Sequence, residues 1–138
     1  LSMGFYGMGV IVLIASPLCD LLGMRRLMWA ALSLHLVGLA GFLFAPGTES
    51  DPKLFWAKAA MLAIGLAHGL VEGVINPLIA TLYPSEKTHK LNVLHAWWPG
   101  GVILGGLAAY WLGQQGVDWK LQWCVGFVPA VTYGLSIL

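Results

Sequence analysis

Three polar side chains recur at helical spacing inside the longest apolar block of this sequence. They are His68, Glu72 and Asn76, and the block runs from residue 54 to residue 82. Positions i, i+4 and i+8 of an α-helix share one face, so these side chains are expected to lie in a row. An imidazole, a carboxyl group and an amide can together bind a polar solute and hold or release a proton.

Glu72 is the most informative member of this row. A block of this length can cross a membrane, and a charged carboxylate at the centre of a bilayer costs at least about 2.5 kcal/mol. Glu72 should therefore face other helices or a water-filled cavity. An apolar surrounding also favours the neutral form of a carboxyl group, which makes Glu72 a candidate proton carrier or hydrogen-bonding group for a substrate. The structural alternative is a glutamate satisfied by Asn92, by His68 or by a backbone group.

The next apolar block offers weaker candidates for the same pathway. Asn92 and His95 are three residues apart, so they can face the same side of a helix. His95 either contacts a solute or bonds to another helix. Trp98 is either a packing aromatic or a surface on which a sugar ring stacks. His35, in an earlier block, is interpreted as a packing residue whose polar atoms are satisfied.

The composition indicates that water is not the main solvent of this chain. Of its 138 residues, 59% are hydrophobic and 9% are charged, whereas soluble domains carry about 25% charged residues. The mean hydropathy is +0.80. A net charge of +1 gives no electrostatic basis for nucleic-acid binding. No catalytic set, phosphate loop or metal-ligand spacing is recognisable, so we expect no enzyme activity, cofactor or metal.

Charged and turn-forming residues divide the chain into apolar blocks of membrane-spanning length. The five blocks are residues 1–18, 27–45, 54–82, 91–113 and 121–138. Each is close to the roughly 20 residues that an α-helix needs to cross the hydrocarbon core, and the short connections require neighbouring helices to alternate in direction. The fold predicted is an all-α, polytopic transmembrane helix bundle. Because the chain starts and stops inside apolar runs, we expect a single partial transmembrane domain from a longer protein.

Small residues and one proline give this bundle further features. Pro77 should kink its helix and free the carbonyl group of Gly73. Two sets of small residues recur every four positions, which lets another helix approach closely. The first set is Gly65, Gly69 and Gly73, and the second is Gly101, Gly105, Ala109 and Gly113.

The first connection, from Ser16 to Arg26, resembles the signature loop of the major facilitator superfamily, roughly G-x-L-A-D-R-x-G-R-K-R. The matching residues are Leu18, Asp20, Gly23, Arg25 and Arg26, and the departures are Ser16, Leu21 and Met24. An aspartate at a helix end can pair with a basic residue as a latch that breaks during the transport cycle. We therefore interpret this connection as a conformational-switch loop, with an ordinary solvated turn as the alternative.

A longer stretch, from Gly65 to Gly106, resembles the sugar-porter branch of that superfamily, which includes the fucose and glucose/galactose permeases. It contains the segment from Glu72 to Pro77, then Tyr83-Pro84, Lys87-Thr88, Leu91-Asn92, His95 and Trp98-Pro-Gly-Gly101. The resemblance implies that the five blocks are helices two to six of twelve. It also matches Glu72 with an acidic fourth-helix residue implicated in proton coupling or sugar binding. Trp98 occupies the position of a sugar-contacting asparagine on the fifth helix.

These observations predict a secondary transporter in a lipid bilayer, in the inner membrane of a bacterium. It would carry a small polar solute, expected to be a sugar, in symport with a proton or another cation by alternating access. The alternative is a non-transporting membrane scaffold or assembly subunit that uses the glycine stripes only for helix packing.

Overall fold

The computed structural model confirms the all-α prediction for the part of the chain that it describes. It describes residues 2–44 and 51–137, without the side chains of residues 16 and 51–53, and these ranges contain helices and turns but no strand. The helices are α1 (Ser2–Leu22), α2 (Met24–Phe44), α3 (Asp51–Leu82), α4 (Lys87–Gln114), α5 (Trp119–Gln122), the 3₁₀ helix η1 (Trp123–Gly126) and α6 (Phe127–Ser136).

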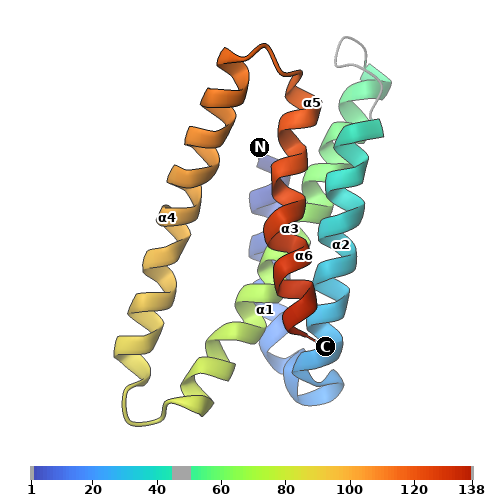
Figure 1. Cartoon of the computed structure of the whole chain (residues 1–138). Helices are drawn as coiled ribbons and strands as arrows, with labels where there is room; N and C mark the ends of the chain where they lie inside the picture. The colour runs from blue at the N-terminus through green and yellow to red at the C-terminus, as the bar shows by residue number, and fades with distance from the viewer. Residues whose placement is uncertain (1, 45–50, 138) are drawn as a thin grey trace.

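Successive long helices run in opposite directions, as the short connections require (Figure 1). The α1–α2 corner and the turn between α3 and α4 lie at one end of the bundle, and the turn between α4 and α5 lies at the other. In this view α4 stands apart from the other helices, and none of its residues is buried. The described chain is therefore a packed group of α1, α2, α3 and α6 with α4 at its margin.

Two helical segments of the described chain are long and apolar enough to cross a membrane, judged by length and composition. They are Met24–Phe44, with a mean hydropathy of 1.9, and Leu54–Leu82, with a mean hydropathy of 1.6. A shorter apolar helix spans Ser2–Ala15. Large apolar side chains also lie exposed on α4, where Leu104 is 64% and Leu107 is 60% exposed. Such a surface is expected to face lipid or other helices.

Helix boundaries differ from the predicted blocks most at the first connection and in the last block, and α3 and α4 begin three and four residues earlier than predicted. The first connection, predicted from Cys19 to Arg26, is helical apart from Gly23, whose φ of +82° turns the chain directly from α1 into α2. Only glycine adopts this left-handed conformation without steric cost, so no longer loop is needed. The last block is divided into α5, η1 and α6 rather than forming one helix. Asp118 caps α5 by accepting the Lys120 N–H at 2.8 Å.

The first glycine stripe packs closely against α1, as predicted. A Cβ atom on Gly65 would fall on the backbone of Gly4, and one on Gly69 would lie 2.7 Å from the carbonyl oxygen of Met8. The second stripe has no such neighbour in the described chain, because nothing lies within 4 Å of a Cβ built on Gly101 or Gly105. Small residues thus make the α1–α3 contact, while the stripe on α4 is uncovered.

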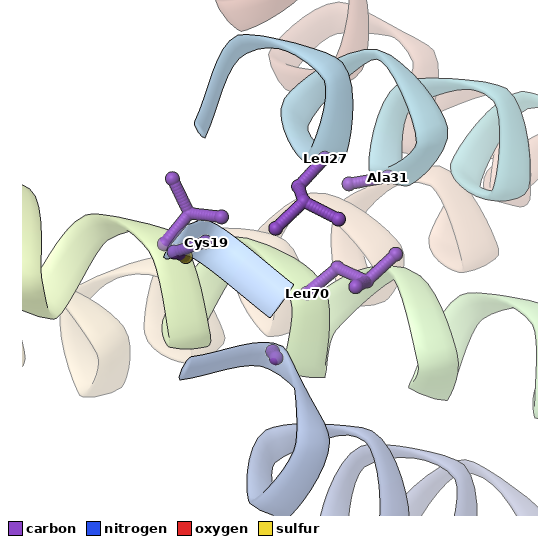
Figure 2. Close-up of a cluster of buried hydrophobic side chains, with 6 residues drawn as sticks. Cys19, Leu27, Ala31 and Leu70 are labelled. Atoms are coloured by element: carbon purple, nitrogen blue, oxygen red, sulfur yellow. The ribbon is translucent and has the colours of Figure 1, made fainter. Parts of the chain in front are cut away.

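A cluster of buried side chains joins α1, α2 and α3 beside this contact. Figure 2 shows Cys19, Leu27, Ala31 and Leu70 of the cluster, with the α2 side chains facing those from α1 and α3. Its members are 7% exposed or less. This cluster fixes α3 against two neighbours and so fixes the direction in which its polar residues face.

Substitution of the first glycine stripe should destabilise the bundle selectively. Gly65→Ala is expected to lower the free energy of unfolding by about 1–3 kcal/mol, because its methyl group meets backbone that cannot rotate away. Gly105→Ala is the matched control, since its methyl group meets open space within the described chain. Unfolding in mixed micelles, followed by circular dichroism, measures both variants. Equal stabilities would contradict the packing role of Gly65.

Candidate functional site

A cavity of about 470 Å³ lies between α1, α3 and α4. Its volume is within the range of about 300–1,000 Å³ that is usual for small-molecule sites. The lining residues are Met8, His68, Val71, Glu72, Ile75, Asn76, Leu94, His95 and Trp98. Apolar walls with a few polar groups are typical of sites that orient a small ligand.

The structure brings five of the six predicted pathway residues to this cavity. His68, Glu72 and Asn76 come from one face of α3, and His95 and Trp98 come from the facing side of α4. Asn92 is not among the lining residues; it is exposed, one turn nearer to the start of α4. The first turns of α4 lie beyond the cavity. Helical spacing tells which face of α4 Asn92 occupies, but not where along the helix the cavity ends.

Glu72 and Asn76 each carry a polar atom without a partner among the described residues. Glu72 is half-buried and makes no hydrogen bond or ion pair with any of them, so neither His68 nor Asn92 satisfies it. The Oδ1 atom of Asn76 is buried and accepts no hydrogen bond from any described group. An unsatisfied buried acceptor costs about 1–3 kcal/mol, so a ligand that donates a hydrogen bond there would be favoured.

Pro77 leaves one backbone carbonyl of α3 without its usual helical partner but does not end the helix. The helix continues through Pro77 to Leu82. Pro77 has no N–H to donate to the carbonyl of Gly73, which instead lies 3.6 Å from the Cys19 Sγ of α1. The thiol therefore satisfies the freed carbonyl and ties α1 to α3 close to the cavity.

The predicted switch loop lies at the end of the bundle that also holds the α3–α4 turn (Figure 1). Asp20, Arg25 and Arg26 are exposed around the Gly23 corner. Burial raises the pKa of the neighbouring Cys19 thiol, and the negative charge of Asp20 raises it further. These positions are compatible with a latch, and the latch itself stays a prediction.

His35 is a packing residue whose ring nitrogens are satisfied, as interpreted, and its partners include a residue of the cavity wall. Its Nδ1 lies 2.8 Å from the hydroxyl oxygen of Tyr133 on α6, and its Nε2 lies 3.3 Å from Nδ1 of His68. The two imidazole rings meet edge to face, with centroids 4.9 Å apart. Polar side chains within apolar helices seek polar partners on neighbouring helices, which is the sequence signal that could have linked His35 with His68.

Comparison with protein-family models, with curated proteins and with solved structures found no match to this chain.

Proposed function

We propose that this chain is part of a secondary transporter that carries a small polar solute, expected to be a sugar, together with a proton. The observation that carries the proposal is the cavity in which Glu72 and the Oδ1 atom of Asn76 lack partners among the described residues. A structural role would leave both groups paired, whereas a solute site needs polar atoms that are free to bind.

The side chains around the cavity suit the binding of a sugar and of a proton. Asn76 and Glu72 can accept hydrogen bonds from hydroxyl groups. The indole of Trp98, which also lines the cavity, can pack against the apolar face of a sugar ring. Glu72 can take up and release a proton as the cavity opens to one side of the membrane and then to the other. Solute and proton would thereby share one site, which couples their movement.

The proposed mechanism is alternating access between two halves of a twelve-helix bundle, as the family resemblance implies. In this arrangement all five predicted blocks cross the inner membrane of a bacterium. The cavity lies between α4 and the α1–α3 pair, so a movement of α4 relative to α3 would change its access. Such rocking around a fixed site is the usual motion of secondary transporters.

A membrane scaffold is the second candidate, and the glycine stripes favour it. The stripe on α3 packs against α1, whereas Gly101 and Gly105 of the α4 stripe have no neighbour in the described chain. A scaffold would use the α4 stripe to bind another helix. It would have no need of an open cavity with unpaired polar atoms.

Transport by reconstituted full-length protein separates the two candidates. Liposomes containing the protein are given radiolabelled sugars one at a time, with and without an inward proton gradient. We expect at least one sugar to accumulate only with the gradient, and a protonophore to abolish its accumulation. Absence of movement for every sugar, by protein that remains folded, would contradict the proposed sugar transport and favour the scaffold.

A further inference from the structure

A chain of hydrogen-bonding side chains connects α6 to the wall of the cavity. It runs from Tyr133 on α6 to His35 on α2 and then to His68 on α3. The Nδ1 atom of His68 also lies 3.1 Å from the carbonyl oxygen of Ile64, one turn earlier in α3. His68 lines the cavity together with Glu72, so the chain ends where the solute is proposed to bind.

The contacts favour one ring nitrogen as the proton carrier in each neutral histidine. A carbonyl oxygen only accepts hydrogen bonds, so the contact with Ile64 requires a proton on Nδ1 of His68. The same proton faces Nε2 of His35, which must then be an unprotonated acceptor. His35 consequently has its proton on Nδ1 and donates it to the hydroxyl oxygen of Tyr133.

The opposite set of proton positions, in which His35 donates a hydrogen bond to His68, is disfavoured. If Nε2 of His35 carried the proton, it would donate to a bare Nδ1 on His68. That bare nitrogen would then face the lone pairs of the Ile64 carbonyl oxygen at 3.1 Å, without a hydrogen between them. Two acceptors at this distance repel each other, because each directs a lone pair at the other.

We propose that His35, held by Tyr133, is a positioning residue that keeps His68 in the form protonated on Nδ1. The Nε2 atom of His68 then has a lone pair available to the cavity. Its role in transport rests on the proposed function: the lone pair accepts a hydrogen bond from a donor on the solute. Together with Glu72 and the Oδ1 atom of Asn76, it gives the cavity a set of acceptors that favours solutes rich in hydroxyl groups.

Titratable groups on α3, α4 and α6 lie around His35 and His68. Glu72 and His95 line the same cavity, from α3 and α4, and Tyr133 faces His35 from α6. No other charged residue of the described chain lines the cavity. The positioning role is therefore to be tested with Glu72 and His95 unchanged.

Nitrogen NMR of the histidine rings tests the assignment directly. Full-length protein with ¹⁵N-labelled histidine is studied in lipid nanodiscs, at a pH where the rings are neutral, and His68→Gln identifies the His68 signals. We expect the wild-type His68 signals to show a protonated Nδ1 and a bare Nε2. Free imidazole side chains in water prefer the other form, so the expected spectrum is distinctive.

Two substitutions of His35 separate positioning from packing. His35→Gln keeps an acceptor near the position of Nε2 and should preserve the His68 spectrum and solute affinity. His35→Leu keeps the bulk but removes the acceptor, so His68 should become a mixture of both neutral forms. The loss of one oriented hydrogen bond should weaken solute binding about tenfold in this variant. Circular dichroism checks that both variants are folded.

The possible results distinguish this inference from the proposed function. A wild-type His68 protonated on Nε2 would overturn the positioning role, whatever the transport assay gives. Equal His68 spectra in His35→Gln and His35→Leu would overturn it as well. If the spectra change as expected while no solute moves, His35 is confirmed as a positioning residue and the transporter proposal is what fails.

Discussion

Accumulation of solute driven by a proton gradient is expected to fall on the order of 100-fold in the Glu72→Gln variant, the lower end of what positioned proton-transfer groups contribute in enzymes. Glutamine keeps the size and much of the hydrogen bonding of Glu72, but it cannot take up a proton at physiological pH. Exchange of solute across the membrane without a gradient should therefore persist. Uptake of labelled solute into liposomes, with and without the gradient, measures both activities.

Glu86→Gln is the matched control for this experiment. Glu86 is exposed in the turn between α3 and α4, its Oε2 atom lies 3.6 Å from Nζ of Lys90, and it is not among the cavity-lining residues. An exposed pair of this kind contributes about 0–1 kcal/mol, so its loss should leave uptake unchanged. If Glu72→Gln accumulated solute as well as Glu86→Gln, Glu72 would not be the proton carrier.

The second large effect is expected for Asn76→Leu, which should weaken solute binding and stabilise the protein without solute. Leucine fills the space of asparagine but removes the Oδ1 atom, which is buried without a hydrogen bond in the described chain. The empty protein should become more stable by about 1 kcal/mol, because an unsatisfied acceptor is removed. Solute affinity should fall about tenfold, because that acceptor is the group the solute satisfies. Chemical unfolding and equilibrium binding measure the two changes.

Asn92→Leu provides the comparison for Asn76→Leu on the neighbouring helix. Asn92 is exposed and outside the cavity lining, so neither affinity nor stability should change beyond about 0.5 kcal/mol. A loss of stability in Asn76→Leu with unchanged affinity would assign Asn76 a structural role. It would also remove one of the two observations on which the transporter proposal depends.

Both predictions use residues that could be selected before any tertiary contact was known. Helical periodicity is a property of the backbone, so the spacing of His68, Glu72 and Asn76 determined that they share one face of α3. The same reasoning assigned a close helix contact to the Gly65 stripe, and it put Asn92 beside His95 on α4, although only His95 lines the cavity. In each case the relevant geometry lies within a single helix.

The sequence by itself determined the helical class, the approximate helix limits and the polar face of α3, because local backbone geometry and apolar periodicity fix them. Only the tertiary structure decided that α1, α3 and α4 line a cavity, that His35 bonds to His68, and that Gly101 and Gly105 on α4 lack a neighbour in the described chain. These features depend on which helix faces meet. Apolar surfaces of similar character can pair in many ways in a membrane, and specific packing and hydrogen bonds select among them.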